Sequence, residues 1–393
     1  MPCLAVCLLV ACSESGSKDP SSADGGSAGF AAMSGAAGSG DHAGSGGASG
    51  ASAGSGTVEG NAGTAPSGGA GAGAAGGASG AGGTAGNLAG AGGSAGTAGG
   101  TPREETLLDL TTVRQEHAVV ALAGEIYVIG GYTPNATATV DAYDPVAQSW
   151  RDVRDFPMAL NHANAAAVGD KLYVTGFYVG SSMSNTSRQV FAYDPAMNEW
   201  TERTPMADGT QRATGCVAAL GDTIYVFGGA RGSTVTDASA YDTVLDEWQS
   251  LPALPESREH CAAGAIDGIL YIAAGRSGGI SGFRPATLAF DPTAMSYSMK
   301  APIPTARGGV AGAVLNDRLL VFGGEGNTAV SSGVFPNVEA YDPRADAWEA
   351  LPPLTIPRHG YGAATLDGRI YLAGGATTQG FGAVNDFSAY YLE

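Results

Sequence analysis

Charged side chains are scarce in this sequence, and positive ones are scarcer. Only 14% of the 393 residues are charged, and 19 basic residues stand against 37 acidic ones, which gives a formal net charge of −18. Because Lys and Arg drive binding to nucleic acid by displacing counterions from phosphates, this balance excludes nucleic acid as an expected partner. No run reaches the roughly 18 apolar residues that mark a membrane-spanning helix.

Cysteine is also scarce. The chain has five, and only Cys216 and Cys261 lie after residue 103. Two cysteines do not form a disulfide framework. They fall in adjacent columns of the repeat described below, and successive side chains of a strand point to opposite sides. We therefore expect no bridge between them.

Glycine is abundant, and half of it lies in one segment. Gly, Ala and Ser make up 65 of the 80 residues from 21 to 100. Such a composition buries too little apolar surface to offset the conformational entropy of the chain. We predict that residues 13–103 form a disordered linker rich in Gly, Ala and Ser.

A short apolar run, Cys3–Ala11, precedes this linker. The run ends in Leu9-Val10-Ala11-Cys12, which resembles the lipobox of bacterial lipoproteins, although no Lys or Arg comes before it. The resemblance implies a signal segment over residues 1–12 and a lipid on Cys12. We expect an outer-membrane lipoprotein or a secreted protein of the cell envelope, held to the membrane through the lipid alone.

Residues 104–393 contain a repeat of about fifty residues, found six times. Each unit has a short apolar run that leads into a pair of small residues, mostly glycine, at Gly130-Gly131, Gly176-Phe177, Gly228-Gly229, Ala274-Gly275, Gly323-Gly324 and Gly374-Gly375. Five units continue with an aromatic residue and Asp, at Tyr143, Tyr193, Tyr241, Phe290 and Tyr341. Seven residues later a second aromatic follows, at Trp150, Trp200, Trp248, Tyr297 and Trp348.

These runs and turns indicate four short strands per unit, bounded by Gly-Asp, Asp-Gly and Asp-Pro turns. The glycine pair, the Tyr and the Trp resemble the kelch repeat from about Glu104 to the C-terminus. The resemblance implies an all-β fold, a six-bladed propeller. The last unit lacks its outer strand, so we expect Leu107–Leu110 to supply it, with Glu104 in the Trp column.

An arginine lies thirteen residues before the Tyr/Leu of the apolar run in five of the six units, at Arg114, Arg212, Arg258, Arg307 and Arg358. We expect these side chains at the entrance of the central channel, on the face that carries the long loops. With Tyr178, Arg276 and Phe283 from those loops, they are the predicted ligand-binding residues, suited to a carboxylate. The alternative for the arginines is an architectural role, bonding loop carbonyls or acids.

No catalytic or metal-binding constellation stands out, and no cofactor is predicted. The histidines near the channel, His117, His162, His260 and His359, occupy three different columns and form no symmetric ring. We therefore expect a monomeric binding module for a protein or carbohydrate, through an Arg-rich face. The alternatives are an enzyme on anionic sugars, resembling kelch-type sialic-acid mutarotases, with His162, His260, Glu116 and Glu259 as acid/base groups, and a spacer without a ligand.

Overall fold

The structure, a computed structural model, describes residues 100–393. The predicted signal segment 1–12, Cys12 and the linker up to residue 99 lie outside the described residues, so these expectations stay predictions. In the described part of the chain, no helix is long and apolar enough to cross a membrane.

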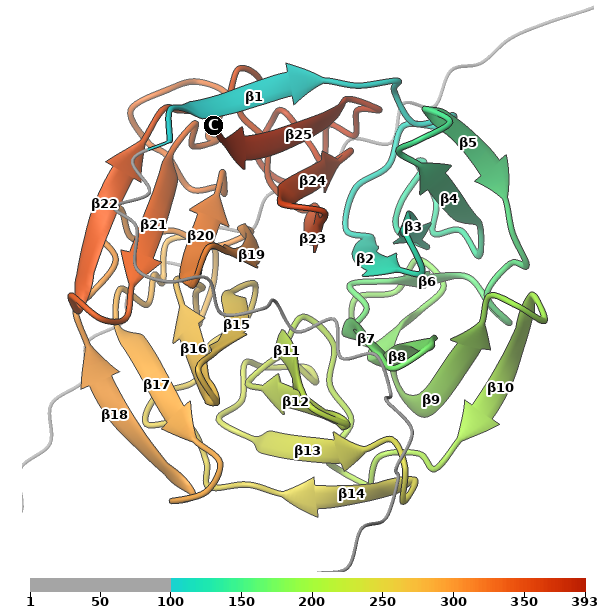
Figure 1. The fold of residues 1–393 in the computed structure, drawn as a ribbon. Helices are drawn as coiled ribbons and strands as arrows, with labels where there is room; N and C mark the ends of the chain where they lie inside the picture. Colours follow the sequence, from blue (N-terminus) through green and yellow to red (C-terminus); the bar gives the residue numbers. More distant parts are fainter. Residues whose placement is uncertain (1–99) are drawn as a thin grey trace, which may run out of the picture. The chain divides into compact units, whose positions relative to one another are not determined.

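Six antiparallel sheets surround a central channel, and each runs outward from the channel to the rim (Figure 1). We number these blades I to VI along the chain. Blade I contains β2 (Ala118–Leu122), β3 (Glu125–Ile129), β4 (Val140–Asp144) and β5 (Ser149–Asp152). Blade II contains β6 (Leu160–Asn161), β7 (Ala165–Val168), β8 (Lys171–Val179), β9 (Thr186–Asp194) and β10 (Glu199–Arg203).

Blades III, IV and V have four strands each. Blade III contains β11 (Cys216–Leu220), β12 (Thr223–Phe227), β13 (Ala238–Asp242) and β14 (Glu247–Ser250). Blade IV contains β15 (Ala262–Ile266), β16 (Ile269–Ala273), β17 (Thr287–Asp291) and β18 (Ser296–Lys300). Blade V contains β19 (Ala311–Leu315), β20 (Arg318–Phe322), β21 (Val338–Asp342) and β22 (Ala347–Leu351). The predicted all-β fold with six kelch-type blades is confirmed.

Blade VI joins the two ends of the described chain. It contains β23 (Gly362–Leu366), β24 (Arg369–Ala373) and β25 (Phe387–Leu392), and its outer strand is β1 (Pro102–Thr106). Glu104 pairs with Tyr390, as the Trp column pairs with Tyr in other blades. The closing strand therefore lies five residues before the predicted Leu107–Leu110, which instead leads from β1 towards blade I. Closure by β1 covers the outer edge of β25 and gives blade VI the four strands that the other blades have.

The repeated acids and tryptophans have local structural roles. Asp144 accepts hydrogen bonds from the backbone amides of Val146 and Ala147, and the same turn recurs at Asp194, Asp242, Asp291 and Asp342. Trp150 donates to the carbonyl of Leu108, and the other tryptophans donate to carbonyls of the segment that enters their own blade from the blade before. These side chains hold each blade to its neighbour.

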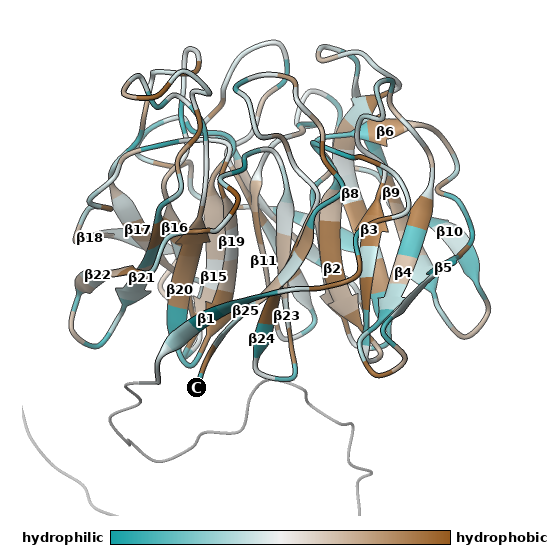
Figure 2. Cartoon of the chain, turned by 90° about the horizontal axis from the view of Figure 1, so that it is seen from above, coloured by the Kyte–Doolittle hydropathy of each residue, from teal (hydrophilic) through white to brown (hydrophobic). Residues whose placement is uncertain are grey.

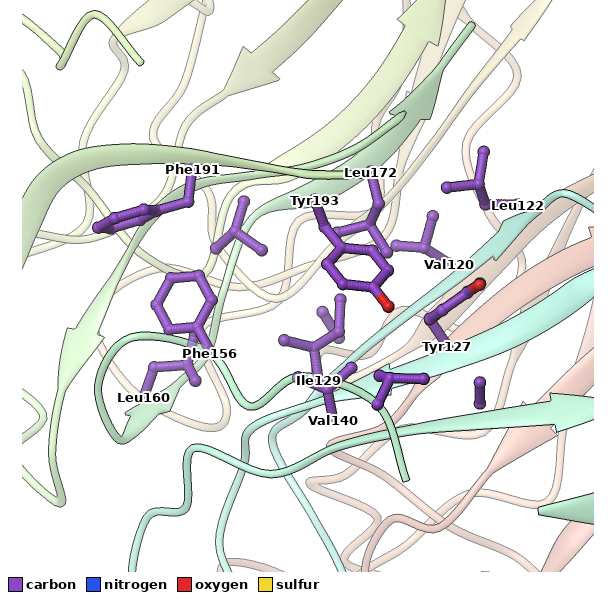
Figure 3. Close-up of a cluster of buried hydrophobic side chains, with 14 of the residues drawn as sticks. Val120, Leu122, Tyr127, Ile129, Val140, Phe156, Leu160, Leu172, Phe191 and Tyr193 are labelled. Carbon is purple, nitrogen blue, oxygen red and sulfur yellow. The ribbon is translucent and has the colours of Figure 1, made fainter. Parts of the chain in front are cut away.

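Apolar side chains fill the spaces between blades. Between blades I and II, Ile129, Val140 and Leu160 pack against Phe156 and Leu172, all fully or almost fully buried (Figure 3). The same cluster contains Phe177, which stands where other units have the second glycine. Its ring lies 5.3 Å from that of Phe156 and is fully buried, so Phe177 belongs to the core and not to the loop face.

The two faces of the propeller differ (Figure 2). One carries the long connections between second and third strands, which we call the loop face. The other carries the tight hairpins between first and second and between third and fourth strands, which we call the turn face. Pro102 pairs with Leu392 at the end of β25. Both ends of the described chain therefore lie at the turn face, opposite the long loops.

A disulfide joins Cys216 to Cys261, with a Cα–Cα distance of 5.2 Å, so the expectation of no bridge is wrong. Adjacent columns do point to opposite sides of a strand, but the two cysteines belong to different blades. Cys216 in β11 points forward to blade IV, and Cys261, one column earlier, points back to blade III. Opposite directions bring side chains of neighbouring innermost strands together.

Candidate functional site: the channel mouth and the loop face

A closed ring of six backbone hydrogen bonds surrounds the channel. Each blade contributes one residue, whose amide donates to the carbonyl of the equivalent residue in the blade before it. The six residues, in blade order, are Glu116, His162, Thr214, His260, Gly309 and Gly360, and the N···O distances run from 2.6 to 3.1 Å. All six have positive φ, between 50° and 69°. The ring fixes the position and direction of these side chains on a rigid scaffold.

Three ring side chains meet in the channel, and we call Glu116, His162 and His260 the channel cluster. A carboxylate oxygen of Glu116, Oε2, lies 3.1 Å from Nε2 of His162 and 3.7 Å from Nε2 of His260. The rings of the two histidines are 5.0 Å apart. Because blade IV lies across the channel from blade I, the cluster spans the opening. The side chains are 6–10% exposed.

A second set of polar groups surrounds the cluster. The Nδ1 of His162 lies 2.5 Å from the amide oxygen of Asn161, and the Nδ1 of His260 lies 3.4 Å from a carboxylate oxygen of Glu259. Arg276 forms ion pairs with Glu259 and with the buried Glu325. Nε2 of His359 donates to the carbonyl of Thr378 at 2.9 Å, and its Nδ1 lies 3.9 Å from a carboxylate oxygen of Glu116.

Burial and charge shift the acid–base properties of these groups. Burial would raise the pKa of Glu116, but the neighbouring histidines outweigh it and lower that pKa well below the usual range. Burial lowers the pKa of His162 to about 4. Burial and Arg276 oppose a charge on His260, yet Glu116 and Glu259 prevail and raise its pKa to about 9. At neutral pH, one positive charge thus sits between two carboxylates.

His117 does not belong to this site. Its ring is buried between blades I and VI, where Nε2 lies 2.9 Å from the carbonyl of Ala373. Burial lowers its pKa to about 3, so the ring is neutral in the folded protein. Only two of the four histidines therefore reach the channel cluster.

The five arginines of the repeated column turn away from the channel into their own blades. Arg114, Arg212, Arg258, Arg307 and Arg358 are at most 1% exposed. Arg114, for example, bonds the carbonyl of Val128 and the carboxylate of Asp141, and Arg307 bonds the carbonyls of Gly323 and Val321 and the carboxylate of Glu339. These contacts fit the architectural alternative, and they leave the guanidinium groups out of reach of a ligand on the surface.

Three further arginines, in or beside the long loops, are paired with acids. Arg188 pairs with Asp208, Arg231 with Asp237, and Arg284 with Glu256. Of the loop residues expected to bind a ligand, Tyr178 is buried with its ring 5.6 Å from that of His162, and Arg276 is buried beside Glu325. Phe283 is half-buried and its ring lies 6.4 Å from that of Phe335.

The exposed part of the loop face is apolar at its tips. Phe381 is 64% exposed, Met183 50% and Val330 46%, each in the long loop of a different blade. Hydrogen bonds connect these loops to neighbouring ones. The hydroxyl of Tyr132 donates to the carbonyl of Ser181, and the backbone amide of Gln379 donates to the carbonyl of Ser332. Each of the three tips therefore lies on a loop that is bonded to the loop of a neighbouring blade.

The channel cluster carried a sequence signal. Glu116, His162 and His260 each stand two residues after the arginine column, counting Leu160 as its member in the second unit. In the enzyme alternative, these three residues and Glu259 are the candidate acid/base groups. The structure brings the four side chains together. What the sequence did not reveal is the left-handed backbone that turns this column into the channel.

Comparisons with known proteins show which family the chain resembles. The model of the KLHDC2/KLHL20/DRC7 kelch-repeats domain matches residues 105–275 and 161–375. Kelch-like protein terF of Aspergillus terreus is 33% identical over 292 residues, which are 70% of this chain and 64% of that protein. Human Kelch-like protein 34 is 32% identical over 61% of this chain and 38% of its own length. Beta-scruin of Limulus polyphemus is 27% identical over 67% of this chain and 31% of its own.

The chain thus spans less than two thirds of these relatives. Among solved structures, one titled "Structure of YjhT" superposes with a TM-score of 0.60, covering 72% of this chain and 96% of that one. The identity is 17%, so the likeness concerns the fold alone.

Proposed function

The chain belongs to the kelch-repeat family, and we propose on this premise that it is a protein-binding module that uses its loop face. The observation that carries the proposal is the set of exposed apolar tips, Met183, Val330 and Phe381, each on a loop that is hydrogen-bonded to the loop of a neighbouring blade. Aromatic and Met side chains are enriched at the centres of protein interfaces. Loops on a rigid scaffold are where binding residues gather.

The arginines do not enter this proposal as contact residues. The five of the repeated column are buried, and Arg188, Arg231 and Arg284 are already paired with acids. A carboxylate-bearing ligand would have to displace those acids. We therefore propose recognition through apolar contact, with the paired charges as a polar rim.

The position of Pro102 supports display of the loop face. The described chain enters the propeller at the turn face, so a tether that precedes it leaves the opposite face free for a partner. We propose that Cys12 is lipidated and that the propeller is exposed at the cell envelope. Labelling with a fatty-acid analogue tests this step: a Cys12→Ser variant that still incorporates label contradicts it.

Matched variants of the two faces test the binding proposal. One variant carries Met183→Ser, Val330→Ser and Phe381→Ser at the loop tips. The control carries Val146→Ser, Val244→Ser and Leu245→Ser, which are apolar residues on the turn face that are 66–93% exposed, more than the loop tips. Polypeptides captured from an extract of the producing cells are quantified for each. We expect at least a roughly tenfold loss for the loop variant, as for hot-spot residues worth more than ~1 kcal/mol. If only the control variant lost captured polypeptides, the binding surface would lie on the turn face and the proposal would be contradicted.

The second candidate is an enzyme on anionic sugars, and the convergence of Glu116, His162, His260 and Glu259 favours it. The arginine nearest these groups, Arg276, is occupied by Glu259 and Glu325. The binding module therefore remains our proposal. NMR of sialic-acid anomers with the protein distinguishes the two, because only the enzyme accelerates their exchange.

A further inference from the structure

The channel cluster has the composition and arrangement of a metal site. One ring nitrogen each of His162 and His260 and one carboxylate oxygen of Glu116 all lie within 4.8 Å of one another. A zinc ion with ligands at 2.0–2.1 Å in a tetrahedral arrangement needs ligand atoms separated by about 3.4 Å. The distances from Glu116 to His162 and His260 are 3.1 and 3.7 Å. These two distances lie on either side of that separation.

Hydrogen bonding determines which nitrogen of His162 faces the carboxylate. The amide nitrogen of Asn161 donates to the carbonyl of Gly180 at 2.6 Å, which fixes the orientation of this side chain. Its oxygen therefore faces Nδ1 of His162, and Nδ1 must carry the proton. In the neutral ring, Nε2 then directs its lone pair at the carboxylate of Glu116. Two lone pairs that face each other at 3.1 Å require a proton or a cation between them.

His260 provides a second, independent observation. Its ring is nine-tenths buried, and neither of its nitrogens makes a hydrogen bond. A buried polar group without a partner is costly and calls for an explanation. Nδ1 lies 3.4 Å from Glu259, whereas Nε2 points towards Glu116 in the channel. Both histidines thus have an oxygen beside Nδ1, the arrangement in which outer groups orient metal-binding imidazoles. At Nε2 of His260, an ion takes the place of the proton that Glu116 and Glu259 stabilise in the ion-free protein.

The scaffold holds these three side chains where an ion needs them. The same ring position is glycine in blades V and VI, and glycine is the residue that adopts positive φ without strain. Glu116, His162 and His260 adopt it at a cost of about 1–2 kcal/mol each. A side chain on Gly360 would collide with the carboxylate of Glu116, so the glycine also makes room for it.

We propose that Glu116, His162 and His260 bind one divalent first-row transition-metal ion, of the zinc type, across the channel of the propeller. Two histidines and one carboxylate form a ligand set used for zinc and non-haem iron, and three protein ligands leave at least one position open. The ion would link blades I, II and IV. This site is separate from the binding function of the loop tips.

Cobalt titration of the full chain tests the proposal. The protein is stripped with EDTA and dialysed into excess Mg²⁺, which occupies weak carboxylate sites on this acidic chain. We expect one equivalent of Co²⁺ to give the visible ligand-field bands of a low-coordinate site, and Zn²⁺ to abolish them. Glu116→Gln and His260→Gln should each weaken Co²⁺ binding by more than about 100-fold, beyond the 10–100-fold effect of outer-shell groups.

The control is His42→Ala, which removes a histidine from another part of the sequence and should leave the titration unchanged. Circular dichroism checks that each variant is folded. Anomalous diffraction at the zinc edge gives a measurement that needs no variant, with a peak expected between the three side chains. Absence of Co²⁺ bands in the wild type, bands that persist in both folded ring variants, or an anomalous peak elsewhere would overturn the proposal.

Discussion

Cys216 and Cys261 are joined by a disulfide that connects β11 of blade III with the residue directly before β15 of blade IV. Their sequence separation is 45 residues. A bridge that closes a loop of this length stabilises the folded state by about 4 kcal/mol in the chain-entropy account. In the described part of the chain it is the one disulfide, and it adds a second covalent link between blades III and IV to that of the main chain.

Removal of this bridge should lower the free energy of unfolding. We expect Cys216→Ala/Cys261→Ala to lose about 2–5 kcal/mol, measured by urea denaturation. Alkylation followed by mass spectrometry checks the bond itself, because neither cysteine should react in the folded protein until a reductant is added. Rapid labelling without reductant, or a double variant as stable as the wild type, would show that the bridge is absent.

The buried arginines predict a stability effect. Replacing Arg307 by Met leaves Glu339, which is 2% exposed, without its charge partner and several carbonyls without a donor. We expect Arg307→Met to cost about 3–5 kcal/mol in the free energy of unfolding. The matched control is Arg188→Met, since Arg188 is half-exposed and should change stability by less than about 1 kcal/mol. Equal effects of the two substitutions would contradict the architectural assignment.

Two equivalent acids predict how stability depends on pH. Asp246 accepts hydrogen bonds from Tyr241 and the amide of Thr204, and Asp346 accepts them from Tyr341 and the amide of Ala301. Burial raises the pKa of Asp246, but these bonds and Arg203 outweigh it, so the pKa is lowered in the folded state. For Asp346, the bonds from Ala301 and Tyr341 lower the pKa.

Because the folded-state pKa is lower than the unfolded one, the stabilisation is present above about pH 4 and is lost as the pH falls below it. Asp246→Asn/Asp346→Asn should flatten the acid limb of stability against pH while the fold is kept. Blade II supports this choice, since Asn198 accepts the equivalent bonds from Tyr193 and Arg154. Asp109→Asn, at an exposed residue, serves as control. If the control flattened the acid limb of stability as much as the double variant does, the assignment would be refuted.

The closing strand predicts the effect of truncation. β1 pairs with β25 along all five of its residues, and Glu105 also pairs with Arg369 of β24. A chain that begins at residue 107 should have a lower melting temperature and form dimers or aggregates, because the edge of β25 is open. A chain that begins at residue 100 should keep the melting temperature of the full chain. Light scattering and thermal unfolding distinguish the two, and identical behaviour would mean that β1 is dispensable.

The sequence predicted the features that follow from repetition. Six copies of the small-residue pair, with the aromatic-Asp and Trp/Tyr columns in five of the units, predicted the number of blades. The repeated Asp residues were predicted to belong to turns. Contacts between blades were harder to predict, because the repeat specifies the strands of one sheet and not which of its side chains meet the next sheet. For this reason the Cys216–Cys261 bridge was not predicted. Side chains that point forward from one blade meet side chains that point back from the next, so opposite directions favour contact.

Side-chain direction was the second difficulty. A column of arginines at the start of the innermost strand does not reveal whether Arg258 points into the channel or back over its own blade, and it points back. The reverse holds for His260, which the left-handed backbone turns into the channel. The repeat alignment thus brings candidate residues to the start of the innermost strands, whereas backbone angles that composition and spacing do not determine decide which of them face the channel.

The most direct measurement of the binding proposal is site-specific photocrosslinking. Benzoylphenylalanine is placed at Phe381 on the loop face or at Leu245 on the turn face, positions that are 64% and 66% exposed. After irradiation with an extract of the producing cells, crosslinked polypeptides are separated and identified by mass spectrometry. A partner crosslinked from position 381 and not from 245 is the result we predict, and a partner crosslinked from position 245 alone would contradict the proposal.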